Sequence, residues 1–138
     1  MILYCDTSSL VKLYIDETYS VDVRSWVRGA DMIATSRVAL PEMVSALTRR
    51  CNNRDLDRQL YELLLQSVRS DWQHILALDV DEQLAADLAQ RHGLRGYDSV
   101  HLASALRLSG RQHISMQFSA FDEHLVRAAA TEGLSVMQ

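Results

Sequence analysis

Short apolar runs alternate along the chain with longer stretches in which apolar residues recur every three or four positions. The short runs are typical of buried strands, and Ile114, Met116 and Phe118 alternate with polar residues as in a half-buried strand. Strands are therefore predicted at residues 2–5, 32–35, 75–78, 114–118 and 134–137. The longer stretches predict helices that begin near residue 7 and then cover residues 21–28, 41–50, 55–68, 81–92, 97–108 and 120–131.

Polar residues and Pro mark the expected helix ends. The hydroxyl side chains of residues 7–9 are suited to cap the first helix, and Pro41 suits a first helical position. Asp55 is expected to start the long helix after it, and Asp81 to cap a helix that ends at Gly93. Because strands and helices alternate, the fold class is α/β, with a mainly parallel sheet covered on both faces.

Length and composition favour a single domain over residues 1–138. The chain has five Gly and one Pro, so it contains no long linker or low-complexity segment. The N-terminus reaches Asp6 before any apolar stretch long enough for a secretion signal, and no run approaches the ~20 apolar residues of a membrane span. Cys5 and Cys51 have no metal-type spacing, which favours reduced thiols and a cytoplasmic location.

The net charge of −4 argues against a broad basic surface for nucleic acid. It argues less against a nuclease, because a group of catalytic acids lowers the net charge by itself. One basic stretch contains Arg49, Arg50, Arg54 and Arg58. These arginines either guide RNA phosphates or form a solvated helix end, where cations are favoured.

Four acids share one kind of position. Asp6 follows the first strand, Glu42 follows Pro41, Asp98 begins a buried helix, and Asp122 follows the strand that ends at Phe118. In a parallel sheet, strand ends and the helix starts after them line one crevice, where ligands bind.

Each acid alone has a structural explanation, because acidic residues are common in first helical turns and as N-caps. Four carboxylates along one crevice repel each other, however, and stay ionised only beside a compensating cation. Mg²⁺ or Mn²⁺ prefers such oxygen ligands, activates water and neutralises charge on a phosphate. The pattern therefore predicts metal-dependent hydrolysis of a phosphodiester.

The segments that contain these acids resemble, in order and spacing, motifs of the PIN-domain family. They resemble most closely the VapC-type toxins of type II toxin–antitoxin systems. The resemblance extends from Asp6 to Val136, and the segments read CDTSSLVKLY, SRVALPEMVSAL, YDSVHLASAL and FSAFDEHLVRAAATEGLSV.

This resemblance implies a three-layer α/β/α fold with a short central sheet and a metal-dependent endoribonuclease activity. By motif, Asp6 and Asp98 would be the main ligands of Mg²⁺ or Mn²⁺. Glu42 would help to hold the metal or its water, and Asp122 would position a second metal or the attacking water. The family also implies a homodimer, a cognate antitoxin as partner and a structured RNA as substrate.

The chain departs from the family pattern at Ala120, where a Ser or Thr is typical. Ser119 is expected to cap the following helix instead. Ser8 matches a small hydroxyl of the family and either orients Asp6 or caps a helix. His101 lies on the same helix face as Asp98 and is either a packed, hydrogen-bonded core residue or a neighbour of the metal site.

Other classes of protein fit less well. A haloacid dehalogenase-type phosphatase needs a second Asp where this chain has Ser8, and a receiver domain needs a late Lys, whereas the only Lys is Lys12. The remaining alternative is a PIN-fold binding or assembly module without catalysis. The large aromatic residues are expected in the core or at a dimer interface and not as base-stacking platforms; they are Trp26, Trp72 and Tyr97.

Overall fold

The computed structural model describes residues 1–137, which form four strands and seven helices. The strands are β1 (Ile2–Cys5), β2 (Met32–Ser36), β3 (Leu76–Leu78) and β4 (Met116–Ser119). The helices are α1 (Thr7–Val11), α2 (Ser20–Gly29), α3 (Ala39–Asn52), α4 (Arg58–Trp72), α5 (Glu82–His92), α6 (Gly96–Ser109) and α7 (Glu123–Thr131).

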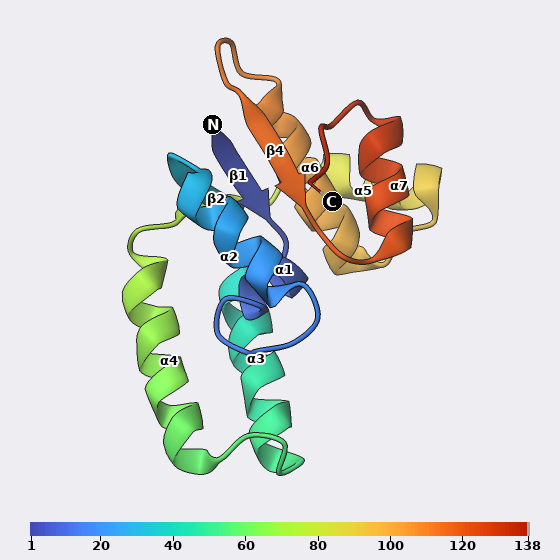
Figure 1. Cartoon of the computed structure of the whole chain (residues 1–138). Helices are drawn as coiled ribbons and strands as arrows, with labels where there is room; N and C mark the ends of the chain where they lie inside the picture. Colours follow the sequence, from blue (N-terminus) through green and yellow to red (C-terminus); the bar gives the residue numbers. More distant parts are fainter. Residues whose placement is uncertain (138) are drawn as a thin grey trace.

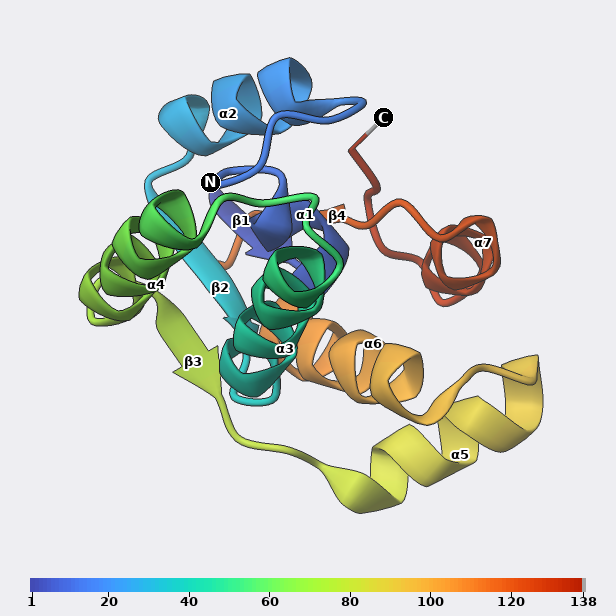
Figure 2. The same cartoon turned by 90° about the horizontal axis from the view of Figure 1, so that it is seen from below.

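The four strands of these residues form one parallel sheet in the order β3-β2-β1-β4. Helices α1 to α4 lie on one side of the sheet and α5 to α7 on the other, as two perpendicular views show (Figures 1 and 2). The predicted α/β class and the three-layer α/β/α arrangement are confirmed. Because all four strands run the same way, their carboxyl ends meet at one edge of the sheet.

Alternating side chains of β1 connect the sheet to two apolar cores. Leu3 and Cys5 pack with α1, α3 and α4, whereas Tyr4 packs with α5, α6 and α7. All three side chains are fully buried, as expected for a central strand covered on both faces. Trp26 and Trp72 pack at the margin of the first core, which confirms the core expectation for these two residues.

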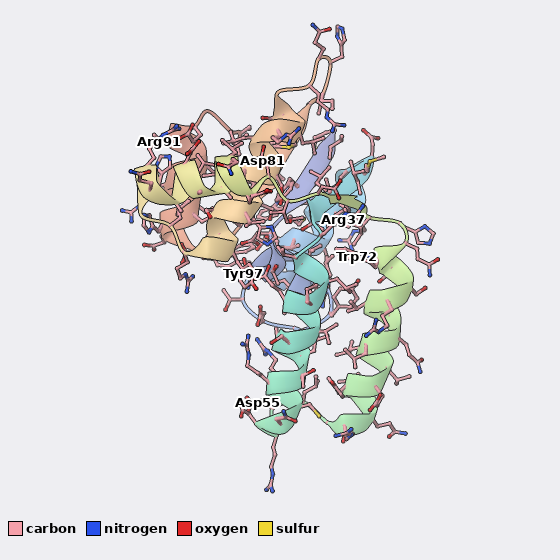
Figure 3. The ribbon with its side chains drawn as sticks, turned by 180° about the vertical axis from the view of Figure 1, so that it is seen from behind. Arg37, Asp55, Trp72, Asp81, Arg91 and Tyr97 are labelled. Carbon is pink, nitrogen blue, oxygen red and sulfur yellow. The ribbon has the colours of Figure 1, made fainter. Side chains whose placement is uncertain are left out.

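The cap predicted for α1 and the starts predicted for α3 and α4 were wrong. Residues 7–9 lie inside α1 and its N-cap is Asp6, while α4 is capped by Asp57, whose carboxylate accepts hydrogen bonds from the next turn. Asp55 lies in the loop at the tip of the α3–α4 hairpin (Figure 3). Pro41 occupies the third position of α3, where its missing N–H costs no hydrogen bond. A carboxylate accepts backbone N–H bonds more strongly than a hydroxyl, which explains why Asp6 caps α1 in place of the hydroxyl residues 7–9.

The predicted last strand is reduced to one bridge. Val136 pairs with Phe118 in parallel, but residues 134–137 form no longer ladder. Leu134 is nevertheless buried in the core beside α7. The apolar pattern of this segment therefore reflects its packing and not sheet pairing. Within residues 1–137, no helix combines the length and apolar character that a membrane crossing requires.

Candidate functional site at the carboxyl edge of the sheet

Asp6 begins the site at the end of the central strand. Its backbone N–H extends the β1–β4 ladder by bonding to the carbonyl of Ser119, at 3.0 Å. Its carboxylate Oδ1 accepts hydrogen bonds from the Ser9 N–H at 2.9 Å and the Ser8 hydroxyl at 2.7 Å. The Ser9 hydroxyl in turn donates to the carbonyl of Ser119, at 2.8 Å. Asp6 is therefore held firmly, and Ser8 both orients it and lies in the first turn of α1.

The Asp6 carboxylate is unusually placed because it is only 4% exposed. Burial raises the pKa of Asp6, and the opposing influences of His101 and of the hydrogen bonds from Ser8 and Ser9 do not cancel this effect. Both hydrogen bonds that it accepts within residues 1–137 go to Oδ1, so Oδ2 remains available to a ligand. A buried carboxylate with a free oxygen is well suited to meet a cation.

Glu42, in the first turn of α3, belongs to a buried hydrogen-bond chain. Its Oε1 accepts from the Thr7 hydroxyl at 2.7 Å and lies 3.0 Å from His101 Nε2. The Nδ1 atom of His101 lies 3.0 Å from the Tyr4 hydroxyl. Partial burial alone would raise the pKa of Glu42, but the bonds from His101 and Thr7 outweigh it and lower the pKa.

The tautomer of His101 follows from these neighbours. Burial raises the pKa of Tyr4 well above its usual range, so the Tyr4 hydroxyl stays protonated and donates to Nδ1. The Nε2–H group then donates to the ionised Glu42. The sequence analysis left two alternatives for His101, a packed, hydrogen-bonded core residue or a neighbour of the site. At 2% exposure and in contact with Glu42, His101 is both.

Asp98 and Asp122 are connected by one arginine. Asp98 lies in the first turn of α6, and Asp122 is the N-cap of α7. Arg95 Nε lies 3.2 Å from Asp98 Oδ2, and its NH2 group lies 3.4 Å from Asp122 Oδ2. The sequence analysis did not single out Arg95, although its position three residues before Asp98 places it within reach of that carboxylate.

Ser119 does not cap α7, so this expectation was wrong. Its hydroxyl lies 2.8 Å from the Ser9 hydroxyl, in the contact between β4 and α1. Asp122 itself accepts from the Leu125 N–H at 2.9 Å. This bond orients Asp122 without a hydroxyl at position 120, where Ala120 is buried.

The cap predicts different results for two substitutions of Asp122. Asp122→Ala removes the acceptor and should lower the free energy of unfolding by about 0.5–2 kcal/mol. Asp122→Asn keeps an acceptor oxygen and should be nearly as stable as the wild type. Urea unfolding of both variants measures the difference, and equal stability of the two would mean that the cap contributes nothing.

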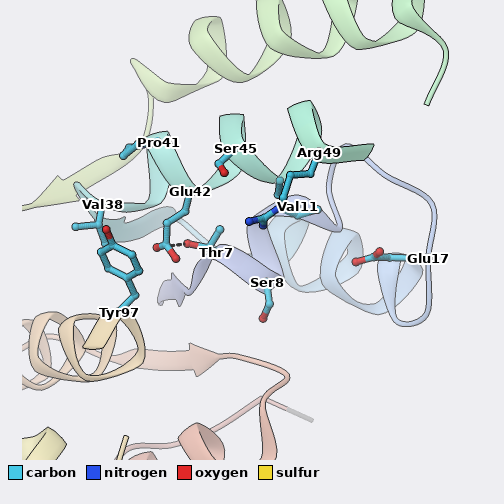
Figure 4. A pocket seen from close by; sticks show the side chains of 11 residues that line it. Thr7, Ser8, Val11, Glu17, Val38, Pro41, Glu42, Ser45, Arg49 and Tyr97 are labelled. Atoms are coloured by element: carbon cyan, nitrogen blue, oxygen red, sulfur yellow. Dashed lines mark hydrogen bonds between the residues drawn. The ribbon is translucent and has the colours of Figure 1, made fainter. Parts of the chain in front are cut away.

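Two cavities open beside these acids. The first has a volume of about 630 Å³ and extends along α3 between Tyr97 and Arg49 (Figure 4). The second has a volume of about 660 Å³ and is lined by Arg95, Asp98 and the first turn of α6. Glu42 and Tyr97 line both cavities. The structure thus places Glu42 beside Asp98, and the Arg95 bridge connects Asp98 to Asp122.

The donor set suits a hard divalent cation, because Mg²⁺ and Mn²⁺ prefer carboxylate oxygens and the free Oδ2 of Asp6 is one. Among residues 1–137, however, no three His, Cys, Asp or Glu side chains lie close enough together to hold a metal ion. Arg95 instead pairs with both Asp98 and Asp122 and offsets one of their two negative charges. Its side chain is 79% exposed.

The basic stretch is divided by the fold. Arg50 bonds to Glu17 at 2.5 Å, and Arg58 lies near Glu62 on the surface of α4. For these two residues the reading as a solvated helix surface holds. Arg49 differs, because it lines the first cavity.

Comparison with known proteins places the chain in a recognised group. The family model described as PIN domain matches residues 3–131. Two proteins of Mycobacterium tuberculosis, Ribonuclease VapC45 and Ribonuclease VapC49, are each 38% identical to the chain over 112 residues. In both comparisons the matched region covers 76% of this chain and 75% of the relative.

Solved structures agree with the fold. FitAcB from Neisseria gonorrhoeae superposes with a TM-score of 0.69 at 18% identity, covering 100% of this chain and 97% of the other. FitAB bound to an IR36 DNA fragment superposes with a TM-score of 0.66 at 19% identity, covering 99% and 94%. At this identity the likeness concerns the fold alone.

Proposed function

The chain belongs to the PIN-domain family, and from this premise we propose that it is a metal-dependent endoribonuclease, the toxin of a type II toxin–antitoxin system. The relatives at 38% identity are named ribonucleases, which supports RNA as the substrate. The observation on which the proposal rests most is the buried carboxylate of Asp6. It lies at the carboxyl end of the central strand with one oxygen free, at the edge where the other three acids lie.

We assign four residues to the site: Asp6, Glu42, Asp98 and Asp122. Asp6 and Asp98 would be the main ligands of Mg²⁺ or Mn²⁺, Glu42 would assist them, and Asp122 would position water. When bound, the cation supplies a polarised water and neutralises charge on the phosphate. The protein orients these oxygens. Ser8 and the α1 backbone hold Asp6, and the hydrogen bonds from Tyr4 through His101 keep Glu42 ionised.

The expected partners follow from the same assignment. We propose that a cognate antitoxin binds the chain and that the toxin acts in the cytoplasm, where the two free thiols of Cys5 and Cys51 stay reduced. The homodimer implied by the family remains a prediction. Leu60 and Leu63, exposed on α4, offer apolar surface for such an association.

The test is RNA cleavage by the purified chain with Mg²⁺, with Mn²⁺ and with EDTA, followed by analysis of the new RNA ends. We expect cleavage only with a divalent cation. An RNA whose 2′-hydroxyl is replaced by hydrogen at the cut should still be cleaved, because water is the nucleophile. Cleavage in EDTA that requires the 2′-hydroxyl would contradict the metal mechanism.

A second candidate function is a PIN-fold binding or assembly module without catalysis. It is favoured by one observation, the Arg95 side chain that already forms ion pairs with Asp98 and Asp122. The same assay separates the two functions. A chain that binds RNA or protein but cleaves no RNA with either cation would establish the second one.

A further inference from the structure

Tyr97 lines both cavities beside the acids and is 62% exposed. Of the two expected positions, the core is therefore excluded for this residue, and a dimer interface stays a prediction. Tyr97 projects from the first turn of α6 toward the first turn of α3, between the two cavities (Figures 3 and 4).

Arg49 marks the opposite end of the first cavity. Glu17 also lines this cavity, but Lys12 at 2.9 Å and Arg50 at 2.5 Å already occupy its two carboxylate oxygens. Arg49 forms no ion pair with any of residues 1–137. Its charge is therefore available to an anionic ligand, and its guanidinium matches the geometry of a phosphate.

The face of α3 between these two residues relates them to the site. Glu42, Ser45 and Arg49 all line the first cavity at helical spacing. Seven residues of helix place Arg49 about 10 Å along the axis from Glu42. Arg49, Thr7 and Glu42 line the same cavity, so a phosphate bound by Arg49 belongs to an RNA strand that also passes the acids.

We propose that Tyr97 and Arg49 form the substrate-positioning groove for single-stranded RNA. One base next to the scissile bond stacks on the Tyr97 ring, and Arg49 binds a backbone phosphate of the same strand. Stacking on an aromatic ring tolerates every base, and a single arginine adds backbone binding without a broad basic surface. The net charge of −4 agrees with RNA binding through one arginine and not through a broad basic surface. The inference rests on the proposed ribonuclease function and specifies its substrate as unpaired RNA.

The experiment measures binding of an RNA that the wild type cleaves, in a common Asp6→Asn background that prevents hydrolysis. Fluorescence anisotropy compares Tyr97→Ala, Tyr97→Phe and Arg49→Gln, with Arg69→Gln as a matched control. Arg69 is exposed in the last turn of α4 and lines neither cavity. A series of RNAs with one abasic nucleotide at each position in turn identifies the stacked base.

Tyr97→Ala should weaken binding roughly 5- to 150-fold, and Tyr97→Phe should retain most of the affinity. If the abasic nucleotide is the one that normally stacks on Tyr97, the RNA has already lost this stacking contact. It should then bind equally weakly to the protein that keeps Tyr97 and to the Tyr97→Ala variant. We expect this result at one position next to the cut. Arg49→Gln should reduce the magnitude of the salt slope by about 0.7, and Arg69→Gln should leave it unchanged.

Several results would overturn the groove. These are wild-type RNA affinity in Tyr97→Ala, an equal loss with every abasic RNA, or a change in self-association or antitoxin binding without a change in RNA binding. The last result would assign the surface to a protein partner. Failure of the proposed function is distinct from all of these, because the wild type would then cleave no RNA at all.

Discussion

Replacing Asp6 by Asn is expected to abolish RNA cleavage, with a loss of at least about 10³-fold. The cation contributes several kcal/mol of transition-state stabilisation, and each 1.36 kcal/mol lost lowers the rate tenfold. Asn keeps the acceptor oxygen that caps α1, so the fold should persist. Full activity of this variant would refute the assigned site.

The same substitution should change how the stability of the metal-free protein depends on pH. Burial raises the pKa of Asp6 in the folded state above the value of about 3.9 in the unfolded chain. Between these two pKa values the folded state binds the proton and the unfolded state does not. The free energy of unfolding therefore falls as the pH rises from the unfolded value through the folded value.

Asp6→Asn removes this decline and should make the metal-free protein more stable than the wild type at neutral pH. Thermal unfolding in EDTA at several pH values measures the effect. Asp87→Asn is the control, because Asp87 is exposed on α5 and its replacement also removes one negative charge. If both variants followed the wild-type profile, burial of the Asp6 charge would cost no stability.

Replacing His101 by Leu is expected to damage stability and activity together. His101 is buried, and its two ring nitrogens contact Tyr4, Thr7 and Glu42. Leu leaves these polar groups without their partner, which should cost roughly 2–4 kcal/mol of unfolding free energy. Glu42 also loses an interaction that lowers its pKa, so cleavage should fall about 10- to 100-fold, as for other residues that orient a metal ligand.

His101→Gln separates orientation from packing, since Gln can restore one hydrogen bond and should lose less activity than Leu. His74→Leu is the control, because His74 is exposed beyond the end of α4. Urea unfolding and single-turnover cleavage of the three variants provide the comparison. Wild-type cleavage by His101→Leu would show that Glu42 needs no orientation by His101.

Much of the fold was predictable from local pattern. The strand over residues 2–5 and the buried helix after Tyr97 follow from apolar runs that only a covered parallel sheet accommodates. The helix starts were less certain. Ser, Thr and Asp all form caps, so the choice between residues 7–9 and Asp6 depended on where the extended backbone ends, which is at Asp6.

The sequence by itself determined the protein family and indicated the four acids as candidate site residues, because residue type and order can be read from a linear motif. Only the tertiary structure decided what surrounds these acids. The sequence does not reveal that Arg95 lies between Asp98 and Asp122. It also does not reveal that Tyr4, 97 positions before His101, joins the hydrogen-bond series that leads through His101 to Glu42. Burial arises from contacts between distant elements; it raises the pKa of Asp6, and the packing of α3 beside α1 places Arg49 in the first cavity.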